Sequence, residues 1–347
     1  MCLNHFFDPV DANFLPIAVI TRLVRVIQNP KLRPLGARWI TRTSRVMTDR
    51  VGRRVNRIKK MIKFFPHAFQ CFRDENSCPD TILDFMSKLV SVKPADGCAW
   101  VTGASSGIGR AVALALAREG WRVIASARGS GGLASLACEA VGLKGSVHPY
   151  PLDVANAQQV ADEFAAFTQA HGPVALAVLN AGIYLPVEIS GALDPALFAQ
   201  SMQINYMGVV NCLAPLVPAQ ISHGRGHVVI VSSVTGYGGL PRAAAYGPTK
   251  AALINLAESL KFDLDRAGVG ISVVCPGFVD TPATADNPFP MPFLISADMA
   301  AQRILQGLQE GRFEITFPRR FTYGLKLLNM LPYRLYFLLI KRITGWR

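Results

Sequence analysis

The amino-acid sequence predicts an α/β fold, a doubly wound parallel sheet of about seven strands with helices on both faces. Two observations support this prediction. Between residues 98 and 317, short apolar segments alternate with longer segments of helical periodicity, which is typical of right-handed βαβ units. The apolar segments are mostly continuous and do not alternate with polar residues, as expected for strands covered on both faces.

The predicted elements follow one another in regular order along this part of the chain. Half of the residues are hydrophobic and 17% are charged, which supplies enough apolar surface for a core and excludes a disordered or fibrous protein. The strands are expected at residues 98–102, 121–127, 146–152, 174–179, 227–232, 270–275 and 313–317. The helices are expected at residues 107–119, 131–141, 156–171, 195–222, 245–267 and 297–310.

The two ends of the chain are basic and the middle is not. The 347 residues include 36 Lys and Arg against 23 Asp and Glu, a net charge of +13. Residues 1–96 have a net charge of +9 and residues 311–347 of +7, whereas residues 97–310 have −3. The central domain is therefore expected to be an ordinary near-neutral globule, with the basic character confined to the ends.

Residues 1–94 are predicted to form a basic N-terminal extension. Segment 42–63 holds nine Lys and Arg and one Asp, with apolar residues at three- and four-residue spacing. This is the pattern of a basic amphipathic helix. Met86 would also serve as the start of a chain that holds the whole alternating region. The sequence leaves open whether the extension is a translated, partly helical domain or a mis-assigned start.

Residues 321–347 are predicted to form an amphipathic basic tail. Within the tail, residues 323–340 mix Leu with Tyr, Phe and basic residues, a pattern that favours a segment lying in a membrane interface. The alternative is a C-terminal helix that packs on a partner subunit. The longest uncharged apolar stretches are expected to fall short of the ~18 to 20 residues that a membrane-spanning helix needs.

A glycine-rich turn follows the first predicted strand. Residues 102–109 read TGASSGIG and open the first helix, where backbone N–H groups and a helix N-terminus can hold a pyrophosphate. Gly103 would permit the tight turn, Gly107 would let the phosphates approach, and Gly109 would let helix and strand pack closely. The sequence therefore predicts a dinucleotide site, although a plain glycine-rich turn would show the same pattern.

The ends of the second and third strands bear on the choice of cofactor. An NAD site usually has a carboxylate at the end of the second strand, but here the strand ends at Ala127 and Arg128. Arg128 can pair with a 2′-phosphate, which favours NADP(H) over NAD(H); the alternative is a solvated loop arginine. Asp153 is placed to accept a hydrogen bond from an adenine amino group, or is a simple turn residue.

Three side chains are of the types that a proton-transfer site needs. Tyr246 and Lys250 are four residues apart in a predicted helix, so their side chains emerge on the same face. A free phenol has a pKa near 10, and a neighbouring ammonium would draw that pKa toward neutral pH. Ser233 ends the preceding strand and can hydrogen-bond the same carbonyl oxygen. Beside a nicotinamide, these groups meet the requirements of hydride transfer to a carbonyl.

Taken together, residues 95–320 resemble a short-chain dehydrogenase/reductase of the roughly 250-residue type. The motifs occur in the family's order: TGASSGIG at 102–109, LDV at 152–154, NAG at 180–182, Asn205, Ser233, Tyr246 with Lys250, and Pro276-Gly277 followed by Thr281. The resemblance implies a Rossmann-type fold. One departure is the Gly247-Pro248-Thr249 between Tyr246 and Lys250, where a proline in the first helical turn is expected to be tolerated.

The resemblance also implies a role for each matching residue. Tyr246 would be the general acid in reduction, Lys250 would lower its pKa and bind the nicotinamide ribose, and Ser233 would polarise the carbonyl, with Ser232 as the alternative. Asn205 would hold a water that links Lys250 to solvent. The full expected set of cofactor-binding residues is Gly103, Ser105, Ser106, Gly107, Ile108, Gly109, Arg128, Asp153, Val154, Asn180, Ala181, Gly182, Tyr246, Lys250, Pro276, Gly277 and Thr281.

The expected function is NADPH-dependent reduction of a carbonyl, or the reverse alcohol oxidation. The apolar, proline-rich segment 278–296 matches a substrate lid of the family and suggests a lipophilic substrate, or else packs on the sheet. A non-catalytic dinucleotide-binding sensor or scaffold is the alternative, which the intact Ser, Tyr, Lys and Asn set disfavours. The histidines lack metal-like spacing, so no metal is expected.

The remaining expectations concern partners and location. Nucleic acid is not expected, because the basic ends carry apolar stripes that suit a membrane surface better. The family resemblance implies a dimer or tetramer through the helices at 195–222 and 245–267, although a membrane-bound tail could cap such a surface. Seven dispersed cysteines without a C-x-x-C pair indicate a reducing compartment, and no signal peptide is recognised. The expected location is the cytoplasm, either free or peripheral on the inner face of a membrane.

Overall fold

The computed structural model describes residues 92–346, apart from residues 189–192, 283, 285–290 and 292. The predictions for residues 1–91, including the basic segment 42–63 and the alternative start at Met86, lie outside the described residues.

The predicted seven-stranded parallel sheet is confirmed. Its strand order is β3-β2-β1-β4-β5-β6-β9, and every neighbouring pair is parallel. Each predicted strand boundary lies within one residue of the observed one, because these strands are short apolar runs with clear polar or glycine ends. The strands are β1 (Cys98–Thr102), β2 (Arg122–Ala127), β3 (Ser146–Pro151), β4 (Val174–Leu179), β5 (Gly226–Val231), β6 (Val269–Pro276) and β9 (Glu314–Phe317).

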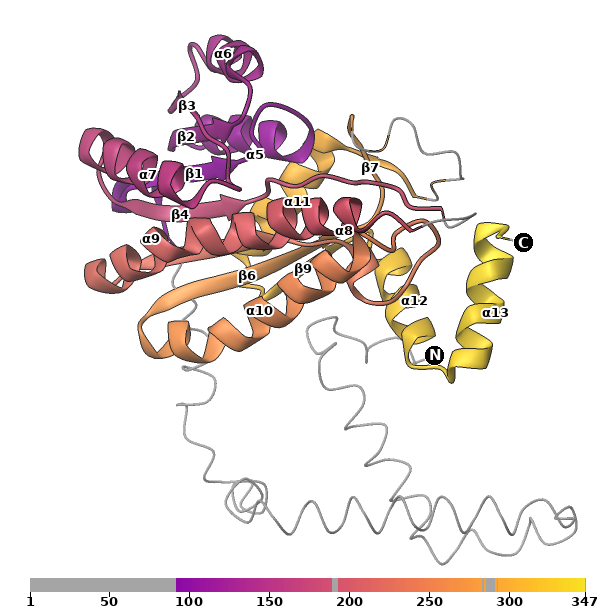
Figure 1. Cartoon of the computed structure of the whole chain (residues 1–347). Coiled ribbons are helices and arrows are strands. Elements are labelled where there is room, and N and C mark those ends of the chain that lie inside the picture. The colour runs from indigo at the N-terminus through magenta and orange to yellow at the C-terminus, as the bar shows by residue number, and fades with distance from the viewer. Residues whose placement is uncertain (1–91, 189–192, 283, 285–290, 292, 347) are drawn as a thin grey trace, which may run out of the picture. The chain divides into compact units, whose positions relative to one another are not determined.

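Helices cover both faces of the sheet, as predicted (Figure 1). In β1, Ala99 and Val101 point into one core, and Cys98 and Trp100 point into the other. This two-sided burial explains why central strands such as β1 and β4 are largely apolar, whereas the edge strand β3 is mostly half-exposed or exposed. One face is covered by α5 (Gly107–Arg118), α6 (Ser130–Glu139) and α11 (Ala297–Gln309), and the other by α7 (Ala157–His171), α9 (Gly208–His223) and α10 (Gly247–Arg266).

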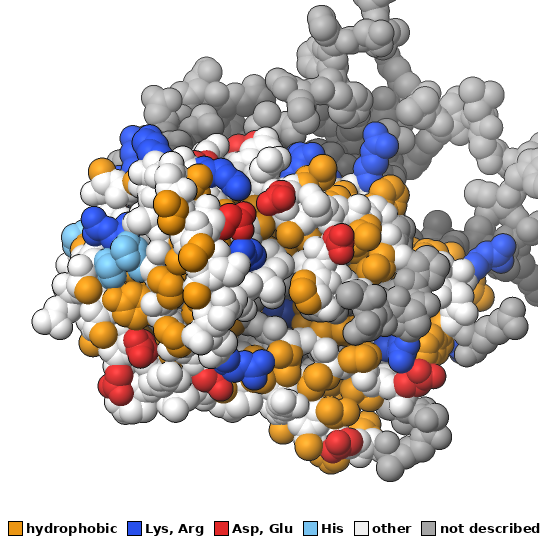
Figure 2. Space-filling view, turned by 90° about the horizontal axis from the view of Figure 1, so that it is seen from above, with side chains coloured by type: hydrophobic (Ala, Val, Ile, Leu, Met, Phe, Trp, Pro, Cys, Tyr) orange, Lys and Arg blue, Asp and Glu red, His pale blue; other side chains and the backbone are white. Residues whose placement is uncertain are grey.

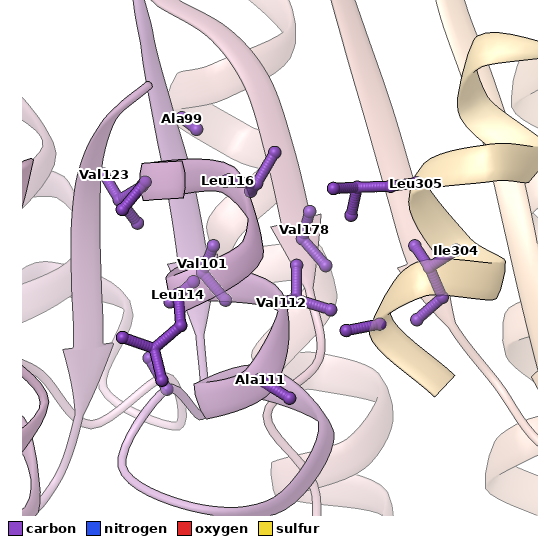
Figure 3. Packing of buried hydrophobic residues seen from close by; sticks show 14 of the residues in the cluster. Ala99, Val101, Ala111, Val112, Leu114, Leu116, Val123, Val178, Ile304 and Leu305 are labelled. Carbon is purple, nitrogen blue, oxygen red and sulfur yellow. The ribbon is translucent and has the colours of Figure 1, made fainter. Parts of the chain in front are cut away.

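Helix α5 holds the first face together (Figure 3). Its Val112 and Leu116 are fully or almost fully buried against the strand residue Val178 and against Ile304 of α11. This packing fixes the axis of α5, and therefore the position of the glycine-rich turn from which the helix starts.

The predicted helix at 195–222 is interrupted in the structure. It consists of α8 (Pro195–Met202), a π-helical segment (Gln203–Met207) and α9. Asn205 lies in the π-helical segment, and its buried side chain hydrogen-bonds the backbone of Ile183. A π-helical turn commonly marks a functional site, and the periodicity of the sequence gives no sign of it.

One helical stretch among the described residues, Pro195–His223, is long and apolar enough to cross a membrane by length and composition. In the fold, α9 packs against β4, β5 and α7. This corrects the expectation that the uncharged apolar stretches fall short of that length, and a helix of a protein core can have the same length and composition.

The tail forms two helices, α12 (Arg319–Asn329) and α13 (Tyr333–Thr344), which lie side by side and are called the α12–α13 hairpin (Figure 1). Helix α12 contacts β9. Tyr336 of α13 is buried, and its hydroxyl donates a hydrogen bond to the Gly239 carbonyl at 2.7 Å. The tail is therefore docked on the same domain as the sheet.

The surface of the sheet domain carries charges of both signs. On the face shown in Figure 2, basic and acidic side chains are scattered among hydrophobic ones. This distribution agrees with the near-neutral charge of residues 97–310 and gives no single-sign field on this face.

Candidate active site

A cavity of about 1060 Å³ lies at the carboxyl ends of the parallel strands. This is the edge at which open α/β sheets bind ligands. The turns after β1 to β6 form one part of its wall, and the α12–α13 hairpin forms another. Of the predicted site residues, all line the cavity except Gly109 and Asn205, which lie behind the wall and support it.

The glycine-rich turn is shaped by two close approaches. Gly103 has φ +66°, and a Cβ at this position would lie 2.9 Å from the Ala181 Cα. A Cβ on Gly109 would lie 2.3 Å from the Gly103 carbonyl oxygen. Helix α5 begins without a side-chain cap from Ser106, so its first N–H groups have no side-chain acceptor there and can bind an anion. The residues present therefore fit a pyrophosphate.

The turn is tied to the end of β4 by Thr102, a residue absent from the predicted set. Its hydroxyl accepts hydrogen bonds from the backbone N–H groups of Asn180 at 3.0 Å and Ala181 at 3.1 Å. The Asn180 side chain donates in return to the carbonyl oxygens of Thr102 at 3.1 Å and Gly103 at 3.3 Å. Asn180 thus holds the turn in place. Thr102 stands in the quoted TGASSGIG motif, but only the fold brings it to β4.

The end of β2 offers a positive charge to the cavity. Arg128 is exposed and lines the cavity. It forms no ion pair with another described residue. Asp153 also lines the cavity, with one carboxylate oxygen accepting a hydrogen bond from the Ala155 N–H at 3.0 Å. The end of β2 therefore presents a cation to the cavity.

Tyr246 and Lys250 lie one helical turn apart at the start of α10. Tyr246 occupies the N-cap position and Pro248 lies in the first turn, so the predicted tolerance of this proline is confirmed. The Lys250 Nζ donates a hydrogen bond to the Val231 carbonyl at 2.9 Å and lies 5.5 Å from the centre of the Tyr246 ring. The helix and the end of β5 thus hold the ammonium beside the phenol.

Burial acts on the pKa of both groups. It raises the pKa of Tyr246 to about 12, opposed by a hydrogen bond with Ser233. It lowers the pKa of Lys250 to about 8. At neutral pH the phenol is therefore protonated and the lysine is mostly an ammonium ion. In this structure burial outweighs any lowering of the Tyr246 pKa by the ammonium, in contrast to the direction that the sequence suggested.

The two adjacent serines have different surroundings. Ser232 is buried, and its hydroxyl donates to the Lys250 backbone carbonyl at 2.7 Å. Ser233 lines the cavity and hydrogen-bonds Tyr246. Of the two residues that the sequence left open, Ser233 is therefore the one beside the phenol, while Ser232 fastens the strand to α10.

The Asn205 side chain connects the chain after β4 with the start of α10. Its side-chain oxygen accepts from the Ile183 N–H at 2.7 Å, and its amide donates to the Ile183 carbonyl at 3.0 Å and to the Thr249 hydroxyl at 3.1 Å. The Thr249 hydroxyl donates to the Tyr246 carbonyl at 2.7 Å. Asn205 thus fixes the chain after β4 relative to α10, and its role in holding a water stays a prediction. Thr249 was not predicted, because the sequence gives no sign of this contact.

The rest of the cavity wall is largely apolar. Its residues come from the loop before α10, the segment after β6 and the α12–α13 hairpin, whose contribution the sequence did not reveal. They include Leu240, Pro241, Phe278, Met291, Phe321, Leu325, Ile340, Ile343 and Trp346. Part of the predicted lid at 278–296 lies outside the described residues.

Comparison with known proteins gives a consistent result. A family model described as short chain dehydrogenase matches residues 97–288. An uncharacterised oxidoreductase of Myxococcus xanthus (strain DK1622) is 37% identical over 67% of this chain and 92% of its own length. The 3-oxoacyl-(acyl-carrier-protein) reductase of Thermotoga maritima is 33% identical over 61% of this chain and 82% of its own.

Solved structures agree with these relatives. A short-chain dehydrogenase/reductase from Burkholderia phymatum, solved in complex with NAD, has a TM-score of 0.61 and 26% identity, covering 68% of this chain and 94% of the other. An alcohol dehydrogenase from Thermococcus sibiricus, solved with 5-hydroxy-NADP, has a TM-score of 0.57 and 25% identity, covering 64% and 95%.

The close approach at Gly109 gives a testable prediction. Gly109→Ala should distort the glycine-rich turn, because the new methyl group would lie 2.3 Å from the Gly103 carbonyl oxygen and 2.6 Å from the Asn180 side-chain nitrogen. Overpacking of this kind costs about 1–3 kcal/mol, so dinucleotide binding should weaken about tenfold or more. The measurement is a fluorescence titration with NADPH. Gly131→Ala is the control, since its Cβ would meet nothing within 4 Å, and its binding curve should match the wild type.

Proposed function

Because this chain belongs to the short-chain dehydrogenase/reductase family of NAD(P)-dependent oxidoreductases, we propose that it uses NADPH to reduce the carbonyl group of a lipophilic substrate. The observation that carries this proposal is the meeting of Tyr246, Ser233 and Lys250 in the cavity that the glycine-rich turn opens. The reverse reaction, oxidation of the alcohol, uses the same groups.

The chain's own residues would bind the cofactor and supply the proton. When bound, the nicotinamide provides the hydride. We propose that the turn at Gly103 and the N-terminus of α5 hold the pyrophosphate, and that Arg128 pairs with the 2′-phosphate. The carboxyl ends of β4 and β6, with Thr281, line the nicotinamide side of the cavity.

Tyr246 is the proposed general acid. Its pKa of about 12 keeps the phenol protonated at neutral pH, so it can give a proton to the carbonyl oxygen as negative charge develops there. Lys250, with a pKa of about 8, supplies an ammonium that stabilises the resulting phenolate. Ser233 donates a hydrogen bond that orients and polarises the carbonyl. A sensor or scaffold needs no such proton donor with a cation beside it.

The preference for NADPH rests on charge at the end of β2. Arg128 lines the cavity there, and the strand ends in Ala127 and Arg128 without a carboxylate to bind ribose hydroxyls. Solved relatives bind either NAD or an NADP derivative, so the family alone leaves the choice open. The guanidinium is the feature that favours the phosphorylated cofactor.

The substrate class follows from the wall of the cavity. Large apolar side chains such as Phe278 and Phe321 line the cavity. A ketone or aldehyde with a long aliphatic or fused-ring body would bury its surface there. The acyl substrate named for the Thermotoga relative belongs to the same broad class.

We further propose that the α12–α13 hairpin holds the enzyme on the cytoplasmic face of a membrane. Leu327, Met330 and Leu338 are 65%, 76% and 61% exposed. Exposed basic residues surround them, which suits an anionic surface. These residues are Arg319, Arg320, Arg334, Lys341 and Arg342. A second copy of the chain, covering the hairpin or the exposed Phe262 of α10, is the alternative partner.

The general-acid role is tested by Tyr246→Phe. Phe keeps the ring but removes the proton donor, so turnover should fall about 100-fold to 10,000-fold, while NADPH affinity should stay within a few-fold of wild type. Steady-state kinetics and a binding titration measure the two effects. Tyr323→Phe, an exposed tyrosine on α12, is the matched control. Turnover of Tyr246→Phe within threefold of wild type would contradict the role.

Cofactor choice is tested by Arg128→Ala. A charged hydrogen bond is worth about 1.5–3 kcal/mol, so the dissociation constant for NADPH should rise tenfold or more. NADH has no 2′-phosphate, and its affinity should barely change. Arg118→Ala, at an exposed position in the last turn of α5, should change neither. Equal losses for both cofactors would refute the assignment.

Membrane binding is tested by flotation with anionic and neutral vesicles at low and high salt. The full chain should float with anionic vesicles at low salt, and the triple variant Leu327→Gln, Met330→Gln, Leu338→Gln should not, because it loses apolar burial. Val141→Gln removes an apolar residue that is 81% exposed elsewhere and should float like the wild type. Absence of flotation by the full chain in every condition would contradict the anchor and favour a second copy as the partner.

A further inference from the structure

One charged side chain of the cavity has no part in the proposed reaction. Four charged residues line the cavity: Arg128, Asp153, Lys250 and Arg242. The first two lie at the strand ends assigned to the cofactor, and Lys250 lies beside the phenol. Arg242 lies in the loop between β5 and α10, four residues before Tyr246, in the part of the wall that is otherwise apolar.

The backbone of Arg242 adopts a conformation that is uncommon for a residue with a side chain. Its φ is +61°, in the left-handed region that favours glycine. Its carbonyl accepts a hydrogen bond from the Val187 N–H at 3.0 Å, which ties this conformation to the chain after β4. Such strain is concentrated at ligand-binding positions, and here it directs a long cationic side chain to the cavity wall.

The charge of Arg242 is only partly compensated by the protein. Its Nη2 lies 3.4 Å from a carboxylate oxygen of Glu188, whose side chain is 56% exposed. Charge-assisted pairs are normally about 2.7–2.9 Å long, and an exposed pair is weakened by water. The Arg242 Nε is buried and has no hydrogen-bond partner within the part of the chain that the structure describes. The guanidinium is therefore incompletely paired within the protein, and its remaining donor capacity suits an acceptor brought by a ligand.

Arg242 also acts on a residue that packs against the phenol. Its positive charge acts on the Tyr184 hydroxyl, opposing the rise in the pKa of Tyr184 that burial causes. The Tyr184 ring packs edge-on against the ring of Tyr246, with 5.2 Å between the ring centres. Tyr184 therefore connects Arg242 electrostatically with the surroundings of the phenol. An acidic group bound by Arg242 would share the cavity with the carbonyl that Tyr246 protonates.

We propose that Arg242 binds a carboxylate of the substrate, and that the substrate is a lipophilic keto acid whose apolar chain runs toward the α12–α13 hairpin. This inference rests on the proposed function, since it assigns the substrate class of the same cavity. The guanidinium fork suits a carboxylate. Because Arg242 acts on Tyr184, which packs on Tyr246, we place the carboxylate near the carbonyl and not at the far end of a long carrier.

The test compares a ten-carbon α-keto acid with its uncharged methyl ester as substrates. The wild type should prefer the acid, and Arg242→Asn should lower the acid-to-ester ratio of kcat/KM at least tenfold, mainly through KM of the acid. Asn tolerates the left-handed backbone, so this variant removes the charge without adding strain. Arg242→Lys should retain part of the preference. Arg303→Asn, at an exposed position of α11, should leave the ratio as in the wild type.

Binding of decanoate and of decanol separates this inference from the reductase proposal, because neither ligand can be reduced. Calorimetry should show decanoate binding that weakens at least tenfold in Arg242→Asn, with a smaller change for decanol. Reduction of the ester together with an unchanged acid-to-ester ratio in Arg242→Asn would overturn the role of Arg242 and leave the reductase function standing. Arg242-dependent decanoate binding without reduction of either keto compound would overturn the reductase function alone.

Discussion

The contact between the ends of β1 and β4 is the constraint on which the site depends. A Cβ on Gly103 would lie only 2.9 Å from the Ala181 Cα. The Thr102 hydroxyl accepts hydrogen bonds from two backbone N–H groups directly after β4. In the strand order, β1 and β4 are neighbours at the point where the chain changes direction across the sheet. The crevice there opens because consecutive helices leave to opposite faces.

The second requirement is a lysine that stays charged inside the protein. Lys250 is 3% exposed, and burial alone would favour its neutral form. The Val231 carbonyl accepts one of its hydrogen bonds, and Ser232 fastens the Lys250 backbone to the same strand end. Asn205 and Thr249 connect the start of α10 to the chain after β4. The cation and the phenol are therefore positioned by hydrogen bonds that reach the end of β5, the π-helical segment and the chain after β4, which would preorganise the proposed proton donor before substrate arrives.

The α12–α13 hairpin gives the apolar part of the cavity its outer wall. Phe321 and Ile340 line the cavity from the inside, and Tyr336 anchors α13 through the Gly239 carbonyl. The opposite side of the hairpin presents apolar residues to the surroundings. The hairpin thus lies between the cavity and the exterior and carries apolar groups toward both. The proposed substrate and the proposed surface partner would therefore both be apolar where they contact it.

Local sequence determined the strands, the order of the βα units, the glycine-rich turn and the Tyr246–Lys250 pair, because each depends on residues close together in the chain. Apolar runs fix strands within one residue, and a spacing of four places two side chains on one helical face. Thr102, Thr249, Tyr184 and Arg242 were not recognised, since their roles arise from contacts between segments far apart in sequence. The π-helical segment at Asn205 and the docking of the tail likewise depend on partners that periodicity does not reveal. Only the tertiary structure decides such contacts, because hydrogen bonds and burial depend on distance in space.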